Sequence, residues 1–437
     1  MQLPPVASLA VPAVLLLISF LAYSSQWLFL YLEPYPLEKR QTIIFNALLV
    51  YLLVSYARAC RIDPGYTPKT VYGLSGAAAK AQQSANAGAP GGKGRQRWCR
   101  KCEAVKPPRT HHCKVCKRCI PKMDHHCPWT ANCVSHITFP HFLRFLFYAV
   151  AAMSYLAYFL FIRCAVIWQN RNLPMYLGPT MIQLIHLFLL VATNSVTLFA
   201  LSILLIRNIW CLGANTTTIE GWEIERHKTV LRRARYFGGY LDGPDGVRVR
   251  IQRQEFPYDI GIWQNFKQGM GSGNILAWFW PLSPSPSIES GLAFPVNGFD
   301  DTSLSWPPPD PDRMQRKVSQ GFDREEAFTQ HGPELTGQES IEAFRRRQQA
   351  DMQRWKAPES YVQRRKPFAK RLETMAGDNE EYGSDGTDND ESMSDSGEEG
   401  WKNSEGERLG DFGVDEDVEF YDENVPLSEL IARRRLR

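Results

Sequence analysis

A dense pattern of cysteines and histidines, C-x2-C-x9-H-C-x2-C-x2-C-x6-H-C-x5-C, runs through residues 99–133. These 35 residues hold seven of the ten cysteines in a chain of 437 residues. Each short C-x2-C turn can present two sulfurs to one metal ion, and a later His and Cys can complete a tetrahedral set of four. The pattern therefore predicts a segment that folds around Zn²⁺.

Counting the possible ligands leaves one thiol over. With His111 and His125 set aside, nine Cys and His positions remain, and two four-ligand sites use eight of them. The best candidate for the free thiol is Cys127, which directly follows an Asp-His-His run. A thiolate is the reactive form of cysteine, so His125 can act as its base while Asp124 orients the ring. Ligand spacing alone does not separate His112 from its neighbour His111.

Four apolar stretches approach or exceed the ~20 residues that a helix needs to cross ~30 Å of hydrocarbon. The second stretch is the shortest, but basic residues flank it as interfacial anchors flank a membrane span. The first stretch lacks the basic start and the cleavage site of a signal peptide, so we keep it as a membrane span. We therefore expect an α-helical multispan membrane protein with transmembrane helices near residues 8–32, 42–57, 142–162 and 177–206.

Basic residues indicate which side of the membrane the cysteine-rich segment faces. Residues 57–140 contain 15 Lys plus Arg, whereas the link between the third and fourth spans has only Arg171, with Arg163 at the edge of the third helix. The positive-inside rule puts the zinc domain in the cytosol, and an even number of crossings puts both termini there too. Lys39 and Arg40, in the first short loop, are a weak opposing signal. A reducing cytosol also suits clustered thiols that bind metal or react.

Composition changes twice along the soluble parts. Residues 73–94 are rich in Ala, Gly, Ser and Gln, which is typical of a flexible linker. Residues 378–423 are strongly acidic and contain too few aliphatic side chains to fold alone, so we expect a largely disordered tail. The net charge of +4 thus combines an acidic tail with a basic membrane-proximal half, whose expected partner is anionic lipid and not nucleic acid.

Three motifs make the chain resemble the DHHC protein S-acyltransferases, or palmitoyltransferases. The signature Asp124-His125-His126-Cys127 lies between spans two and three, Asp63-Pro64-Gly65 follows span two like the family's DPG motif, and Thr217-Thr218-Ile219-Glu220 follows span four like its TTxE motif. The resemblance covers about residues 1–230. Ser135 and Thr138 depart from it, since the family usually has Gly and Asn there, and this puts the local turn geometry in question.

The resemblance implies an acyl transfer in two steps. Cys127 would attack the thioester of palmitoyl-CoA, the acyl donor, and then pass the chain to a cysteine of a membrane-associated protein, with His125 and Asp124 assisting. Two structural Zn²⁺ ions would be held by interleaved ligand sets, which for the first ion are Cys99, Cys102, His112 and Cys119, and for the second Cys113, Cys116, His126 and Cys133.

Family members bury the acyl chain between the transmembrane helices, so the resemblance also implies an apolar cavity near Cys127. Trp129, Phe142 and Phe145 lie near the nucleophile or at the start of the third span and are the expected contacts at the mouth of this cavity. Interfacial anchoring or ordinary packing would explain the same aromatic residues.

The expected organisation has six parts. They are helices one and two (1–62), the DPG motif and linker (63–96), the cytosolic zinc domain (97–141), helices three and four (142–210), the TTxE motif and membrane-proximal region (211–283), and the tail (284–437). A weaker resemblance to the fungal branch, through Tyr258-Asp259-Ile260-Gly261 and Trp278-Phe279-Trp280-Pro281, implies the endoplasmic reticulum.

Two other functions use some of the same features. A membrane adaptor could bind partners through the zinc domain and leave Cys127 unused. A membrane-embedded ubiquitin ligase is less consistent with the sequence, because the common ligase modules space their ligands more widely and need no Asp-His-His-Cys run.

Overall fold

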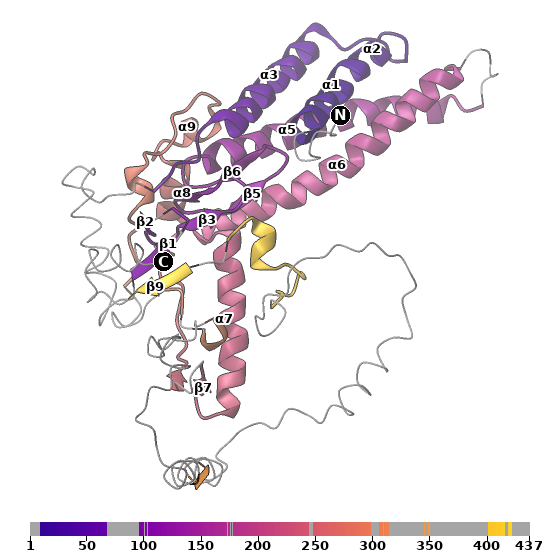
Figure 1. The fold of residues 1–437 in the computed structure, drawn as a ribbon. Helices are drawn as coiled ribbons and strands as arrows, with labels where there is room; N and C mark the ends of the chain where they lie inside the picture. The colour runs from indigo at the N-terminus through magenta and orange to yellow at the C-terminus, as the bar shows by residue number, and fades with distance from the viewer. Residues whose placement is uncertain are drawn as a thin grey trace, which may run out of the picture. The chain divides into compact units, whose positions relative to one another are not determined.

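The computed structural model describes residues 9–67, 96–298, 306–313, 401–415 and 418–421, apart from 100, 103, 173, 175, 177, 244–247 and 309, together with 345, 348 and 349 (Figure 1). Residues 315–399 form a unit separate from the rest of the chain. The linker expected over 73–94 and most of the expected acidic tail lie outside the described residues.

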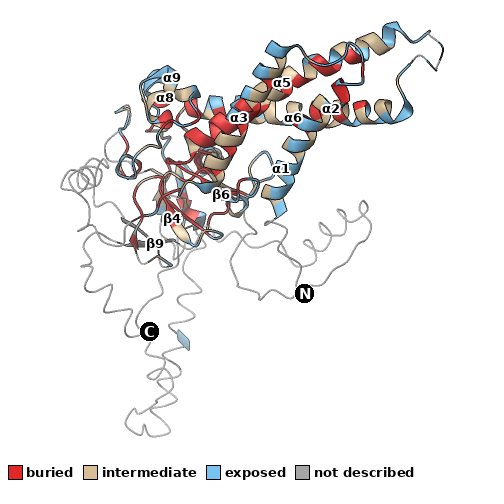
Figure 2. Ribbon diagram, turned by 90° about the horizontal axis from the view of Figure 1, so that it is seen from above, coloured by how far each residue is buried: buried red, intermediate tan, exposed pale blue. Residues whose placement is uncertain are grey.

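In the described part of the chain, four helices are long and apolar enough to cross a membrane, which confirms the predicted fold class. The first span consists of α1 (Ala10–Ser19), a π-helical turn (Phe20–Ser24) and α2 (Ser25–Phe29). The other three are single helices, α3 (Lys39–Arg61), α5 (Phe139–Gln169) and α6 (Met181–Gly213). Buried residues, red in Figure 2, line the faces at which α5 packs against α3 and against α6.

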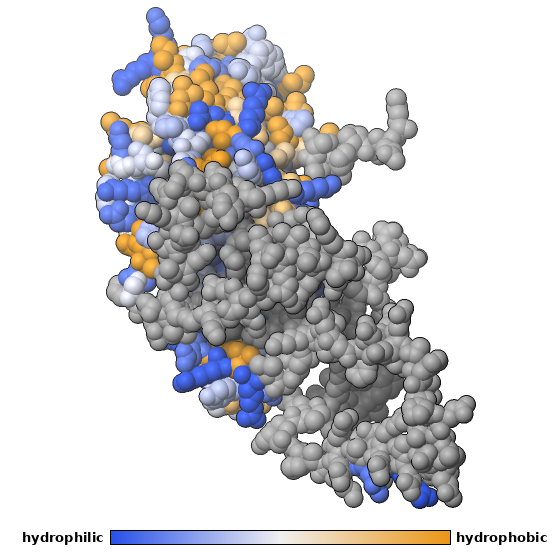
Figure 3. Space-filling view, turned by 60° about the vertical axis from the view of Figure 1, so that its left-hand side comes forward, coloured by the Kyte–Doolittle hydropathy of each residue, from blue (hydrophilic) through white to orange (hydrophobic). Residues whose placement is uncertain are grey.

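The outward faces of these helices are apolar. Phe161, Phe188 and Phe199 are each about 70% exposed, and apolar side chains gather at the upper part of the molecule, where the long helices lie (Figure 3). Large exposed apolar surface is unfavourable in water and is satisfied by lipid, so these faces are those of membrane helices.

The second and third spans are longer than their apolar stretches. A capping box between Glu38 and Gln41 starts α3 at Lys39, because it satisfies backbone N–H groups that have no partner inside the helix. Arg163, expected at the edge of the third span, lies inside α5 and is 1% exposed. Its guanidinium stacks on the Phe29 ring and donates to the Tyr35 carbonyl at 2.9 Å, and these contacts compensate for its burial.

The cysteine-rich segment folds as three short antiparallel units between α3 and α5. One is a three-stranded sheet in the order β2-β1-β9, and two are hairpins, β3-β4 and β5-β6. The strands are β1 (Gln96–Cys99), β2 (Ala104–Val105), β3 (His111–Cys113), β4 (Arg118–Ile120), β5 (His125–Cys127), β6 (Asn132–Val134) and β9 (Val418–Tyr421). Strands this short have little hydrophobic core of their own, so their positions depend on ligand clusters and on neighbouring helices.

Beyond the fourth span the chain returns to the zinc domain. The elements there are α7 (Thr218–Tyr236), the hairpin β7 (Tyr240–Asp242) and β8 (Arg248–Arg250), α8 (Ile262–Met270), α9 (Ile275–Phe279) and short 3-10 turns at Glu289–Gly291, Pro311–Arg313 and Leu409–Phe412. A second capping box, between Thr217 and Glu220, starts α7 directly after α6. Residues 401–415, inside the expected tail, contact the zinc domain, which composition did not predict.

Candidate active site and metal centres

The eight predicted metal ligands form two groups of four. In each group the ligand atoms all lie within 4.8 Å of one another. A tetrahedral zinc with Zn–S of about 2.3 Å and Zn–N of about 2.0 Å separates its ligand atoms by about 3.5 Å. His112 Nδ1 lies 3.2–3.8 Å from the sulfurs of its group, and His126 Nδ1 lies 3.5–3.7 Å from the sulfurs of the other. Both groups therefore have the donor set and the size for zinc.

Hairpin register explains why these residues meet. His112 pairs with Cys119 across β3-β4, and His126 pairs with Cys133 across β5-β6, so each hairpin contributes two ligands on one face. A C-x2-C turn from the preceding segment supplies the other two. His111 is outside both groups, because adjacent residues of a strand point to opposite faces.

Cys127 lies outside both metal-ligand groups and beside His125 and Asp124. Strand β5 carries His125 and Cys127, and Asp124 precedes it. The carboxylate Oδ2 of Asp124 lies 2.7 Å from Nδ1 of His125, so the ring donates to it and the other ring nitrogen is left for chemistry. Cys127 is only 5% exposed.

The electrostatics of these three residues favour an ion pair. Burial opposes charge on His125, but the Asp124 carboxylate and the Cys127 sulfur outweigh it and raise the pKa of the imidazole to about 10. Burial also opposes the Cys127 thiolate, but His125 and Thr130 lower the pKa of the thiol below its usual value. The Asp124 pKa is lowered because His125 and Thr218 outweigh its burial. The group is therefore poised as carboxylate, imidazolium and thiolate.

The first turn of α7 holds Asp124 in place. Thr218 donates its backbone N–H to Asp124 Oδ1 at 2.8 Å, and its hydroxyl donates to the Asp124 carbonyl at 2.6 Å. The positive end of a helix stabilises a carboxylate at this position. The TTxE motif thus touches the reactive group through its second threonine.

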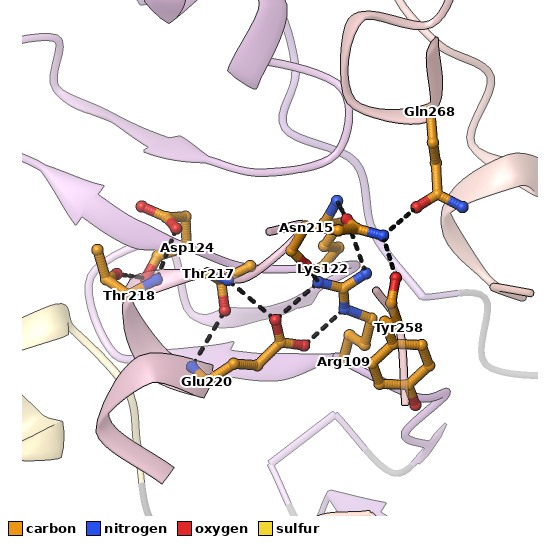
Figure 4. A network of polar contacts seen from close by, with 9 residues as sticks. All are labelled: Arg109, Lys122, Asp124, Asn215, Thr217, Thr218, Glu220, Tyr258 and Gln268. Atoms are coloured by element: carbon orange, nitrogen blue, oxygen red, sulfur yellow. Dashed lines mark hydrogen bonds and ion pairs between the residues drawn. The ribbon is translucent and has the colours of Figure 1, made fainter. Parts of the chain in front are cut away.

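The glutamate of the same motif makes a buried ion pair with the zinc domain (Figure 4). Arg109 donates to both Glu220 oxygens, at 2.5 and 2.7 Å, and both side chains are 2% exposed or less. Arg109 also donates to the Asn215 carbonyl at 2.5 Å, and Lys122 donates to the Asn215 side chain at 2.7 Å. The Asn215 amide in turn donates to Gln268 at 2.7 Å, so the turn between α6 and α7, the start of α7, α8 and the zinc domain share one network.

The end of α3 supports the opposite side of the zinc domain. Asn132 donates to the carbonyls of Ala59 at 3.0 Å and Ile62 at 2.8 Å, which are among the last acceptors of that helix. Ser135, one of the two departures from the family pattern, donates to the Pro64 carbonyl at 2.8 Å. Thr138, the other, accepts from Ser135 N–H at 2.9 Å, so the turn satisfies its polar groups with these residues.

An apolar cluster adjoins Cys127 on the membrane side. It contains two of the three predicted acyl-chain contacts, Phe142 and Phe145, together with Tyr56 of α3. The Phe142 ring lies 5.9 Å from that of His125, and the Phe145 ring lies 5.0 Å from that of Tyr56. Trp129 is outside the cluster and 59% exposed, and its carbonyl accepts a hydrogen bond from the Tyr56 hydroxyl at 2.8 Å.

Residues 92–225 match the family model described as DHHC palmitoyltransferase. The chain is 55% identical over 438 residues to the Palmitoyltransferase pfa4 of Emericella nidulans, and the alignment covers 99% of this chain and 97% of that relative. The chain belongs to the DHHC palmitoyltransferase family. It is also 52% identical to Palmitoyltransferase pfa4 of Aspergillus fumigatus, over 98% of both chains, and 41% identical to Palmitoyltransferase PFA4 of Gibberella zeae, over 100% of this chain and 97% of that one.

Membership confirms the resemblance drawn from the motifs and makes the protein a protein S-palmitoyltransferase. It sets aside the adaptor and the ubiquitin ligase. Sequence reasoning missed three supports of the palmitoyltransferase site, which are Thr218 on Asp124, Tyr56 beside the apolar cluster and Asn132 on the end of α3. Thr218 lies in the TTxE motif, and Asn132 lies in the run Asn132-Cys133-Val134, which also matches the family pattern, so both had a usable signal. Nothing local distinguishes Tyr56.

Proposed function

We propose that this palmitoyltransferase uses Cys127 as its nucleophile and transfers a long-chain acyl group from acyl-CoA to cysteines of membrane-associated proteins. The observation that carries the proposal is the contact of Asp124 with His125 beside a thiol that belongs to neither metal-ligand group. Seven cysteines lie close together in this domain, and six of them belong to those groups. Cys127 is therefore the thiol available for covalent chemistry.

In the first step the Cys127 thiolate attacks the thioester carbonyl. The carbon–sulfur bond to coenzyme A breaks, and the departing thiolate takes the proton that His125 holds. Cys127 is then an S-acyl cysteine and His125 is neutral. Because one thioester is exchanged for another, the step is nearly balanced in free energy, and the site acts by supplying a formed thiolate in a fixed orientation.

In the second step His125 takes the proton of the substrate cysteine, whose sulfur attacks the acyl group on Cys127. The bond from Cys127 to the acyl carbon breaks, and Cys127 returns as a thiolate beside protonated His125. Asp124 keeps the same ring nitrogen protonated throughout, so His125 exchanges protons only through its other nitrogen.

The acyl chain is proposed to lie against the apolar cluster that adjoins Cys127. Phe142 and Phe145 pack there, and each methylene moved out of water contributes about 0.8 kcal/mol, so a palmitoyl chain has ample driving force for binding. Trp129 is assigned to the rim because of its exposure. Which chains are preferred depends on the depth of the space between the helices.

Zn²⁺ in the two ligand groups is proposed to be structural, since four protein ligands leave no open position for substrate. The ligands fix β3-β4 and β5-β6 and therefore the orientation of the reactive residues on β5. The zinc domain and both termini are assigned to the cytosol from the excess of Lys and Arg around that domain, and the membrane is proposed to be that of the endoplasmic reticulum.

The test is covalent labelling of the purified full-length protein. Given acyl-CoA with a labelled palmitoyl chain, the protein should become labelled on a bond that hydroxylamine cleaves. Cys127→Ser should remain unlabelled, whereas Cys60→Ser, which changes a cysteine packed against the same apolar cluster, should label normally. Equal labelling of Cys127→Ser and the parent would contradict the assignment of the nucleophile.

A further inference from the structure

A segment near the C-terminus completes the core of the zinc domain. Residues 401–415, the C-terminal strap, lie more than 160 residues beyond the end of α7 in sequence yet pack against it and the zinc domain. Leu409, Phe412 and Val414 are 2%, 7% and 4% exposed. They share an apolar cluster with Ile120, Met123, Ile219 and Trp222, and the Trp401 ring packs edge-on against Trp222 with centroids 5.0 Å apart.

Backbone hydrogen bonds join the strap to both metal-ligand groups. Lys114, next to the ligand Cys113, donates its N–H to the Gly413 carbonyl at 2.9 Å. Asp415 donates its N–H to the carbonyl of the ligand His112 at 2.8 Å. Just beyond the strap, β9 pairs antiparallel with β1, the strand that ends at the ligand Cys99. The first ligand group therefore lies next to the end of the strap and to β9, and the second group lies next to the strap backbone at Gly413.

The closest approach is at Gly413. Its φ is +80°, and a Cβ atom built there would lie 2.9 Å from His126 Cβ and 3.9 Å from Cys113 Sγ. Only a glycine lets the backbone run this close to the second ligand group. The strap thus covers a side of that group that water and competing thiols would otherwise reach.

Polar contacts hold the ends of the strap. Lys101, next to the ligand Cys102, forms an ion pair with Asp415. At the other end Ser404 donates its N–H to Glu225 at 2.7 Å, and Glu405 pairs with Arg207 at 3.1 Å. These contacts are half-exposed, so the apolar side chains provide most of the attachment.

We propose that the C-terminal strap is a docked segment that seals both metal-ligand groups and thereby controls how fast they lose zinc. The apolar surface that the zinc domain and α7 form together is its binding site, specific for a tryptophan, a leucine and a phenylalanine followed by glycine. The inference rests on zinc occupying both groups, as proposed above, but not on the acyl-transfer chemistry.

Zinc release from the full-length protein tests the proposal. The purified protein is mixed with the chelating dye 4-(2-pyridylazo)resorcinol, and the colour of the zinc complex is followed with time. Leu409→Ser/Phe412→Ser should release zinc about tenfold faster or more, because its strap loses most of its buried apolar surface. Lys402→Ser, which changes an exposed side chain of the same segment, should match the parent.

Rescue in trans separates an undocked strap from a misfolded domain. A synthetic peptide of residues 400–421 should restore slow release to Leu409→Ser/Phe412→Ser, and the same peptide with both serines should not.

Gly413→Ala should release one zinc equivalent quickly and the other at the parental rate, since the added Cβ collides at His126. Parental rates in both variants, or fast release that the peptide does not slow, would overturn the proposal.

Acyl labelling of the same samples keeps this test distinct from that of the function. An unlabelled parent with slow zinc release would refute the proposed chemistry and leave the strap in place. A labelled parent, together with strap variants that release zinc at the parental rate, would refute the role of the strap and leave the proposed chemistry in place.

Discussion

Thr218 donates its backbone N–H to Asp124 Oδ1 at 2.8 Å, so the first residue of α7 holds the carboxylate that orients His125. The two residues are 94 positions apart, on opposite sides of two transmembrane helices in the chain. The contact links the membrane-proximal C-terminal region directly to the reactive group. In the proposed mechanism Thr218 is a positioning residue, because it contacts Asp124 and would act on the acyl group only through Asp124 and His125.

Replacing Thr218 with valine should lower the rate of self-acylation by about fivefold while the protein stays folded. The change removes the hydroxyl that binds the Asp124 carbonyl but keeps the backbone N–H, and one such hydrogen bond is worth about 1 kcal/mol. Single-turnover labelling at saturating acyl-CoA measures the rate. Thr229→Val, which removes a hydroxyl bonded within α7, is the control, and an equal loss there would indicate a general effect on the helix.

The labelling rate should depend on pH with a broad plateau. As the pH increases, the rate should reach its plateau at a pH below the ordinary thiol pKa of about 8.5, because the pKa of Cys127 is lowered. The rate should fall again near pH 10, where His125 loses its proton. Asp124→Asn removes the carboxylate that supports the imidazolium. The rising limb should then move to higher pH and the falling limb to lower pH, with the maximum reduced about 100-fold. An unchanged profile with a lower maximum would argue that Asp124 does not tune His125.

Glu220→Ala should destabilise the protein by about 3–5 kcal/mol, because it leaves the guanidinium of Arg109 buried without its partner. Thermal unfolding in detergent, followed by exposure of the cysteines to a thiol-reactive dye, measures this. Arg109→Met/Glu220→Leu removes both charges and should recover much of the loss. If the double variant were less stable than Glu220→Ala, the loss in Glu220→Ala would not come from the unpaired charge of Arg109. The attraction within the ion pair would then exceed the free-energy cost of burying its two charges.

Cys116→Ser should reduce bound zinc from about two equivalents to about one, because it removes one ligand of the second group only. Elemental analysis after gel filtration gives the stoichiometry. The variant should also lose self-acylation. His126 of that group lies between His125 and Cys127 on β5, and it pairs with the ligand Cys133 on β6. Cys164→Ser, at an exposed cysteine outside both groups, should keep both zinc equivalents.

Local spacing predicted two four-ligand zinc sites and one free thiol, and the family resemblance assigned the individual ligands to each site. The ligand groups meet as expected, because two-residue turns and short hairpins bring residues together that are close in sequence. The four spans followed from apolar length alone, and only their ends were misjudged, since capping residues such as Glu38 extend a helix past its apolar stretch. Asp124, His125 and Cys127 are consecutive or nearly so, and the short strand β5 with the residue before it is enough to bring them together.

The contacts that support the site were decided by the tertiary structure, although family motifs pointed to some of the residues that make them. Thr218 and Asp124 are separated in the chain by two transmembrane helices. Asn132 lies 73 positions from Ala59 of α3, and Phe145 meets Tyr56 of α3 across the whole zinc domain in sequence. The strap is the extreme example, because an acidic, Pro- and Ser-rich tail gives no sign that Leu409 and Phe412 have an apolar surface to pack against. Composition determines whether a segment can bury a core of its own. Whether another part of the chain offers it an apolar surface depends on how the helices and the metal-bound hairpins pack in three dimensions.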